Sequence, residues 1–146
     1  GGRAVCYALL QEGVPEIRLV NRSHDRAKTL ANEFGGPIDV MLWEARHEAV
    51  SGVTMVVNVT NQGMVGEKAL DLKLNALPQS AIAYDIIYTP LESPFLALAR
   101  ARGNQAINGL GMLLHQGPPA WARWFDLEPI VTEQLRETME HSIAAS

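Results

Sequence analysis

Apolar and polar residues alternate in blocks along the chain, and the blocks predict strands and helices in turn. Short apolar runs rich in Val, Ile and Leu have the length of strands and stand at residues 16–21, 38–43, 53–60, 81–88 and 105–108. The run VTMVVNVT, residues 53–60, is apolar almost throughout, which is typical of a strand buried on both faces of a parallel sheet.

Apolar residues at helical spacing fill the stretches between these runs. The predicted helices cover residues 3–12, 24–34, 94–102, 110–124 and 129–145. Ser23 and Ser93 are expected to be N-caps, because a serine side chain can accept a hydrogen bond from a free N–H group of the first turn. Pro118 and Pro119 should kink or split the fourth helix, because proline has no backbone donor, and Pro129 should lie near the start of the last one.

Strands that alternate with helices predict an α/β fold, a Rossmann-like parallel sheet with helices on both faces. Ligands bind such sheets at the carboxyl ends of the strands, so functional residues are expected just after each strand. The chain opens with Gly1-Gly2-Arg3 and enters an apolar helix directly. We therefore expect the first strand of the fold to be missing, and the chain looks like a piece of a longer protein.

Composition narrows the classes of function and location. The 146 residues suit one domain, 47% of them are hydrophobic, and the net charge of -4 argues against nucleic acid as the main partner. No apolar run is long enough to predict a membrane span, and no export leader is recognised. The single cysteine, Cys6, fits a reducing cytoplasm, and the histidines show no metal-ligand spacing. Trp43, Trp121 and Trp124 are expected to be packing residues.

Two arginines stand where the strand at residues 16–21 passes into the next helix. In a dinucleotide-binding unit this is the position of the residue that reads the ribose, and an acid there favours NAD. Here Asn21, Arg22 and Ser23 take its place, and Arg26 lies one turn into the helix. Guanidinium groups can bind a 2′-phosphate in forked geometry, so the pattern favours NADP. The alternative is that both arginines are solvated charges with Asp25 as a local partner.

Four motifs follow one another in an order and spacing that resemble a known family. They are NRSHDRA, NVTNQGM, AYDIIYTPLESPFLALARARG and INGLGMLLHQ. Together they resemble the NADP-binding half of shikimate dehydrogenase, which interconverts 3-dehydroshikimate and shikimate in aromatic amino-acid biosynthesis. The resemblance covers essentially the whole chain. It implies that residues 1–146 are an NADP-binding domain fragment, whose helices from about residue 110 pack back toward a substrate domain.

The resemblance also implies roles for individual residues. The implied cofactor contacts are Asn21, Arg22, Ser23, Arg26, Thr60, Ile86, Gly109 and Met112, and the implied substrate contacts are Tyr88 and Gln116. Each also has a structural alternative: Tyr88 as an ordinary strand tyrosine, Gln116 and Met112 as core residues, and Thr60 with Asn58 as caps of a strand end. Asp85 is expected to be structural and to hold the turn before Tyr88.

The chain departs from the family pattern at its start. Gly1 and Gly2 most closely match the two variable positions of the family's Gly-x-Gly-Gly-x-x-Arg fingerprint, so the phosphate-binding glycines are expected upstream. The catalytic lysine and aspartate belong to the family's substrate domain, and no lysine of this chain stands in a matching motif. We therefore assign no catalytic residue here. Two alternatives stay open, a quinate-using relative and a non-catalytic NADP-binding module, and so does a homodimer.

Overall fold

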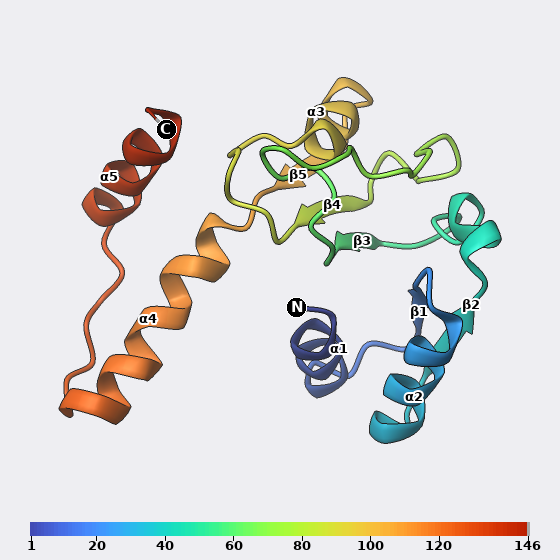
Figure 1. Cartoon of the computed structure of the whole chain (residues 1–146), viewed down its shortest axis with the longest axis horizontal. Coiled ribbons are helices and arrows are strands. Elements are labelled where there is room, and N and C mark those ends of the chain that lie inside the picture. Colours follow the sequence, from blue (N-terminus) through green and yellow to red (C-terminus); the bar gives the residue numbers. More distant parts are fainter. Residues whose placement is uncertain (146) are drawn as a thin grey trace. The chain divides into compact units, whose positions relative to one another are not determined.

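The computed structural model describes residues 1–145, and it divides into two compact units. The first unit comprises residues 1–54 and 71–78, and the second comprises residues 55–70 and 79–146. Each unit contains one parallel sheet with helices packed on it (Figure 1). The chain therefore crosses from one unit to the other three times.

The first unit contains a two-stranded sheet. Its elements are α1 (Gly2–Gln11), β1 (Ile17–Val20), α2 (His24–Phe34), β2 (Ile38–Met41) and the 3₁₀ helix η1 (Trp43–His47). Strands β1 and β2 run parallel, with Ile17 opposite Ile38. Helix α2 packs on both strands through a face that buries Ala27. Helix α1 contacts the end of α2, where Arg3 pairs with Glu33 and lies over the ring of Phe34.

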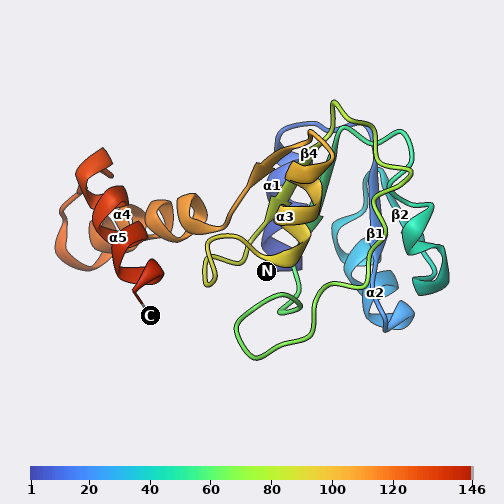
Figure 2. The same cartoon turned by 90° about the horizontal axis from the view of Figure 1, so that it is seen from above.

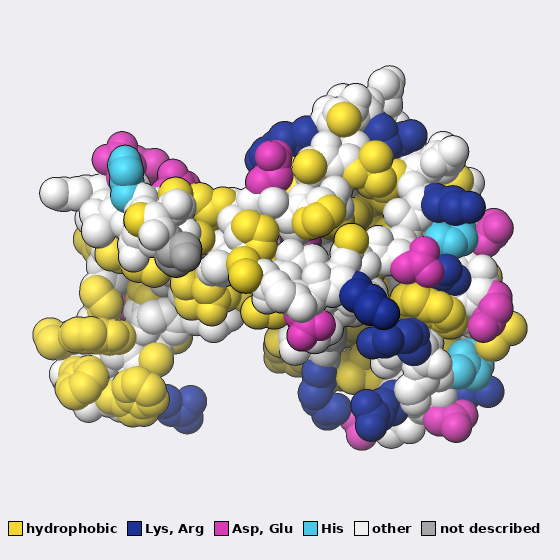
Figure 3. Space-filling view, turned by 45° about the horizontal axis from the view of Figure 1, so that its top comes forward, with side chains coloured by type: hydrophobic (Ala, Val, Ile, Leu, Met, Phe, Trp, Pro, Cys, Tyr) yellow, Lys and Arg dark blue, Asp and Glu magenta, His cyan; other side chains and the backbone are white. Residues whose placement is uncertain are grey.

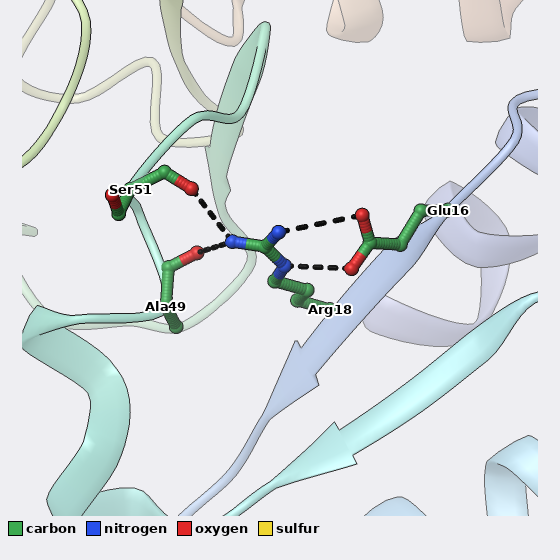
Figure 4. A network of polar contacts seen from close by, with 4 residues as sticks. All are labelled: Glu16, Arg18, Ala49 and Ser51. Atoms are coloured by element: carbon green, nitrogen blue, oxygen red, sulfur yellow. Dashed lines mark hydrogen bonds and ion pairs between the residues drawn. The ribbon is translucent and has the colours of Figure 1, made fainter.

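Arg18 of β1 connects the strand to the segment after η1. Its Nη1 atom donates to the backbone carbonyls of Ala49, at 3.1 Å, and Ser51, at 2.7 Å (Figure 4). Its Nε atom donates to Glu16, at 2.7 Å, and this hydrogen bond lowers the pKa of the Glu16 carboxyl. The guanidinium group therefore provides hydrogen-bond donors for two backbone carbonyls of a loop, which have no partner in a neighbouring strand.

The second unit contains a three-stranded parallel sheet in the order β3-β4-β5. Its elements are β3 (Met55–Asn58), β4 (Ile82–Asp85), α3 (Pro94–Ala101), β5 (Gln105–Ile107), α4 (Leu110–Phe125) and α5 (Glu133–Ala144). Helix α3 packs on β4 and β5 (Figure 2), and its inward residues Phe95, Leu96 and Ala99 are buried. Ala83 and Asp85 of β4 are fully buried, which makes this side of the sheet the core of the unit.

The predicted α/β class with parallel strands is confirmed, but the strands do not form one sheet. Within residues 1–145, β1 pairs only with β2, and β3 pairs only with β4. Both strands therefore keep one edge without a partner strand in the described chain.

Four boundaries differ from those expected. Trp43 opens η1 instead of ending a strand, and β4 ends at Asp85, so that residues 86–88 belong to a loop. Helix α4 runs unbroken through Pro118 and Pro119, so the expected split is wrong. Helix α5 begins at Glu133 rather than at residue 129, because the Thr132 side chain accepts a hydrogen bond from the Leu135 amide and so caps the helix there. None of the helices described in residues 1–145 combines the length and apolar character that a membrane crossing requires.

Candidate cofactor and substrate site

A hollow of about 390 Å³ lies where β3 and β4 of the second unit end. This volume is in the range of small-molecule sites. It is lined by Val59, Thr60, Asn61, Met64, Ile86, Ile87, Tyr88, Thr89 and Met112. Four of these residues, Thr60, Ile86, Tyr88 and Met112, are among those that the sequence predicted to contact cofactor or substrate. They come from the loop after β3, the loop after β4 and the first turn of α4.

The loop after β3 is folded around the side chain of Asn58, which is buried. Its Oδ1 atom accepts hydrogen bonds from the Thr60 amide, at 3.0 Å, and from the Thr60 hydroxyl, at 2.8 Å. Its Nδ2 atom donates to the backbone carbonyl of Gln62, at 3.0 Å. Asn58 and Thr60 therefore do cap the strand end, as the structural alternative expected, and the same bonds hold Thr60 at the wall of the hollow.

The loop after β4 is fixed by Asp85, whose side chain is completely buried. Its Oδ1 atom accepts from the Ile87 amide and from Asn58 Nδ2, both at 3.1 Å, and its Oδ2 atom accepts from the Ser93 hydroxyl at 2.6 Å. Burial raises the pKa of this carboxyl, and the three hydrogen bonds oppose the rise. The expectation that Asp85 holds the turn before Tyr88 is confirmed.

Gly109 lies in direct contact with the loop after β4. Its amide donates to the carbonyl of Ile87 at 2.8 Å. A Cβ atom on Gly109 would lie 1.9 Å from the carbonyl oxygen of Ile86, which is far inside van der Waals contact. The backbones of Ile86 and Gly109 can approach each other only because this position has no side chain.

Three side chains near the hollow differ in their placement. Tyr88 lines it and is 37% exposed, and its hydroxyl makes no hydrogen bond within residues 1–145. Met112 also lines it, from α4. Gln116 lies one turn further along α4 on the same helix face, is exposed, and does not line the hollow. Tyr88 lies in the loop after β4 and not in a strand, and Gln116 is exposed and not in the core, so these two structural alternatives are wrong.

Arg22 and Arg26 lie in the first unit, at the carboxyl end of β1 and in the first turn of α2. Both are exposed, and neither makes an ion pair or side-chain hydrogen bond within residues 1–145. In particular, Asp25 pairs with neither, so the alternative of a local Asp25 partner is wrong. Asn21 Oδ1 accepts from the Ser23 amide at 3.3 Å. Ser23 is the N-cap of α2 as expected, but its side chain accepts no hydrogen bond from the helix, which leaves the N–H groups of the first turn available to an anion.

The sequence did not single out Asn61 and Met64 as lining residues, although both belong to the quoted motif NVTNQGM. The sequence signal for them was Gly63, because a glycine can adopt the positive φ of +105° that turns the loop between Asn61 and Met64. Thr89 was missed because β4 was expected to continue through Tyr88.

Comparisons with known proteins agree with this arrangement. No protein-family model matches the chain. The shikimate dehydrogenase (NADP(+)) of Paramagnetospirillum magneticum is 52% identical over 134 residues, which are 92% of this chain and 49% of that protein. The chain is similar to the C-terminal half of shikimate dehydrogenases. The resemblance expected from the motifs is therefore confirmed.

Solved structures show the same relation to shikimate dehydrogenase and its relatives. Shikimate 5-dehydrogenase from Thermus thermophilus, in complex with NADP(H) and shikimate, matches with a TM-score of 0.76 and 33% identity over 99% of this chain and 51% of that one. Quinate dehydrogenase from Corynebacterium glutamicum, in complex with NAD, matches with a TM-score of 0.84 and 29% identity. The match covers 94% of this chain and 50% of that one. The chain thus spans about half the length of the relatives that it matches.

Proposed function

We propose that this chain is the NADP-binding half of a cytoplasmic, NADP-dependent shikimate dehydrogenase, an enzyme that interconverts 3-dehydroshikimate and shikimate in aromatic amino-acid biosynthesis. One observation carries the proposal: a single hollow gathers Thr60, Ile86, Tyr88 and Met112, which stand in three separate segments of the sequence. The similarity to NADP-dependent shikimate dehydrogenases supports it.

In this proposal the first unit reads the phosphate that distinguishes NADP from NAD. Arg22 and Arg26 bind the 2′-phosphate of the adenosine, with Asn21, Ser23 and the N–H groups of α2 beside them. They are suited to this because no acidic side chain of residues 1–145 neutralises them. Their exposure and free donors therefore fit NADP.

The hollow would bind the nicotinamide end and the substrate. NADP supplies a hydride acceptor at C4 of its ring. The backbones of Ile86 and Gly109 meet the nicotinamide, and Met112 packs against its ring and excludes water. Tyr88 and Gln116 donate to or accept from the substrate's hydroxyl and carboxylate groups, and they orient its carbon 3 without adding charge. The proton of the reacting hydroxyl goes to a group outside residues 1–146, where the family carries its lysine and aspartate.

The full-length protein that contains this chain provides the direct test. Initial rates with shikimate and with quinate, each with NADP⁺ and NAD⁺, should be highest for shikimate with NADP⁺. Quinate with NAD⁺ is the informative rival pair, because a quinate dehydrogenase in complex with NAD shares the fold. A preference for that pair would replace our proposal, and binding of NADP without turnover of either acid would favour a non-catalytic module.

Replacing Arg22 by Ala should weaken NADP binding by about tenfold to a hundredfold and leave NAD binding almost unchanged. The reason is that a charge-assisted hydrogen bond is worth roughly 1.5–3 kcal/mol, and only NADP carries the 2′-phosphate. Fluorescence titration of the full-length enzyme with NADPH and NADH measures both affinities. Lys28→Ala is a matched control, since it removes the same charge from an exposed position of α2. Equal losses for both cofactors would show that Arg22 does not read the phosphate.

Replacing Gln116 by Ala should lower kcat/KM for shikimate by at least about tenfold while NADPH affinity stays the same. Its exposed amide has no partner within residues 1–145 and can hydrogen-bond a polyhydroxylated acid, whereas alanine cannot. Steady-state kinetics measure the first quantity and fluorescence titration the second. His115→Ala is the control, from the neighbouring exposed position of α4. Wild-type kinetics in Gln116→Ala would remove this residue from the substrate site.

The end of α4 and helix α5 are proposed to pack on the substrate domain. Trp121, Trp124 and Phe125 are 49%, 73% and 59% exposed, and Ile130 is 84% exposed. Figure 3 shows hydrophobic side chains gathered on the part of the surface formed by these helices. Helix α5 buries no residue. Trp121 and Trp124, which were expected to be packing residues, contact the ring of Phe125 but keep much of their surface exposed, and this exposure supports a covering domain.

A further inference from the structure

A buried polar network joins both loops of the hollow to the start of α3. Asn58 uses its amide completely, with two hydrogen bonds accepted and two donated, and one of the latter goes to Asp85. Asp85 accepts three hydrogen bonds, from Asn58, the Ile87 amide and the Ser93 hydroxyl. Ser93 in turn caps α3 by accepting from the Leu96 amide at 3.4 Å. Two of these bonds join separate segments: Asn58 to Asp85 connects the two loops, and Ser93 to Asp85 connects the second loop to α3.

We propose that Asp85 is a positioning residue for hydride transfer, because it holds the loop after β3 and the loop after β4 at a fixed separation across the hollow. The proposal rests on the proposed function, since it assumes that these loops hold the nicotinamide and the substrate. Asp85 itself does not line the hollow and acts through its neighbours. Through the Ile87 amide it sets the position of Ile86 and Tyr88, and through Asn58 it sets that of Thr60.

The chemistry of the position requires a carboxylate. Three N–H or O–H donors from β3, the loop after β4 and the start of α3 converge on its two oxygens, and Asp85 has no exposed surface. An apolar side chain of similar size would leave those three donors without an acceptor. An asparagine that keeps its oxygen toward the two donors at Oδ1 turns its NH₂ group toward Ser93, so the short hydrogen bond from the Ser93 hydroxyl to a carboxylate is replaced by a weaker one from the amide to that hydroxyl. Either replacement loosens at least one of the joined segments.

Close packing supports the same role. Gly63, in the loop after β3, is buried. A Cβ atom added to it would lie 3.4 Å from Ser93 Cβ and 3.6 Å from Ile87 Cδ1. The two loops and the start of α3 therefore meet directly over the network. Closely packed groups of this kind pass a shift in one segment to its neighbours.

The test uses Asp85→Asn in the full-length enzyme, with Ser93→Ala as a second variant that removes the Oδ2 bond alone. We expect Asp85→Asn to lower kcat for shikimate at least about tenfold while NADPH affinity changes less than about threefold, because the clamp at Arg22 and Arg26 is untouched. Amide hydrogen exchange at Thr60 and Ile87 should become at least about tenfold faster. Ser93→Ala should show the same changes in smaller measure.

Asn104→Ala separates positioning from stability. Asn104 is also buried, but it donates to the carbonyls of Gln79 and Ala81, at the opposite end of β4 from Asp85. The Asn104→Ala substitution should lower the melting temperature. It should leave kcat and the amide hydrogen exchange of Thr60 and Ile87 as in wild type. The proposal is overturned if Asp85→Asn keeps the wild-type kcat and amide exchange. It is also overturned if Asn104→Ala and Asp85→Asn, at equal loss of melting temperature, lower kcat equally. A wild-type enzyme inactive with shikimate would defeat the proposed function instead, and the exchange rates would still decide whether Asp85 holds the loops.

Discussion

Replacing Gly109 by Ala is expected to lower the melting temperature of the full-length enzyme by about 3–10 °C and to weaken NADPH binding at least about tenfold. The new Cβ atom would lie 1.9 Å from the Ile86 carbonyl oxygen and 2.3 Å from its carbon. Overpacking of a filled site costs typically about 1–3 kcal/mol, and contacts with backbone are the hardest to relieve. The backbone torsions of Gly109 are ordinary, so the clash and not the conformation carries the effect.

The loop that meets Gly109 cannot easily withdraw. The Ile86 amide donates to the Asn58 carbonyl at 3.1 Å, and Ile87 is bonded on one side to Asp85 and on the other to Gly109. The clash should therefore displace the start of α4 together with Met112, which lies in its first turn. Thermal melting by circular dichroism and NADPH titration measure the two consequences.

Gly117→Ala is the matched control for this prediction. Gly117 lies in the same helix, and a Cβ atom there would meet nothing within 4 Å. Alanine at this open position should leave cofactor binding unchanged, because its side chain would touch no other segment of the site. If Gly109→Ala behaved like Gly117→Ala, the contact between Ile86 and Gly109 would not constrain the site.

Elements with local start signals were predicted from the sequence at their observed bounds. Helix α3 begins after Ser93, whose side chain accepts the Leu96 amide, so this signal acts within one turn of its own residue. Helix α2 begins after Ser23 as predicted, although the Ser23 side chain accepts no hydrogen bond from the helix. Thr60, Ile86, Tyr88 and Met112 were named from the resemblance to shikimate dehydrogenase, and the strand pattern predicted only the edge of the sheet where they lie. Parallel strands place their carboxyl ends on one edge of the sheet, so residues that follow β3 and β4 must meet there.

Features that depend on distant contacts were not predicted. Strand β4 was expected to continue to Tyr88, but Asp85 accepts the Ile87 amide and so ends the strand. That bond depends on Asn58 and Ser93, which stand 27 and 8 positions away in the sequence. The apolar pattern carries no information on such partners. The unbroken course of α4 through two prolines was missed as well, because a local rule favoured a break.

The polypeptide of residues 1–146 on its own is expected to be inactive with 3-dehydroshikimate and NADPH. In the proposed function the hollow supplies binding and orientation, and the proton comes from a lysine and an aspartate of the family's motifs. Lys28, Lys68 and Lys73 stand in no such motif. An assay of NADPH oxidation with this polypeptide should therefore show no turnover, and the full-length enzyme under the same conditions is the control. Turnover by residues 1–146 would show that the proton donor lies among them.

The same polypeptide is expected to lack a cooperative thermal transition above about 50 °C. Strands β1 and β2 form a two-stranded sheet, which is marginally stable by itself, and β1 and β3 each present an edge with unpaired N–H and C=O groups. Open edges also template aggregation, because a strand of another chain can pair with them. Circular dichroism measures the thermal transition and gel filtration the association state, both for residues 1–146 and for the full-length protein. A soluble monomer of residues 1–146 that melts cooperatively above that temperature would show that the open edges need no further strand.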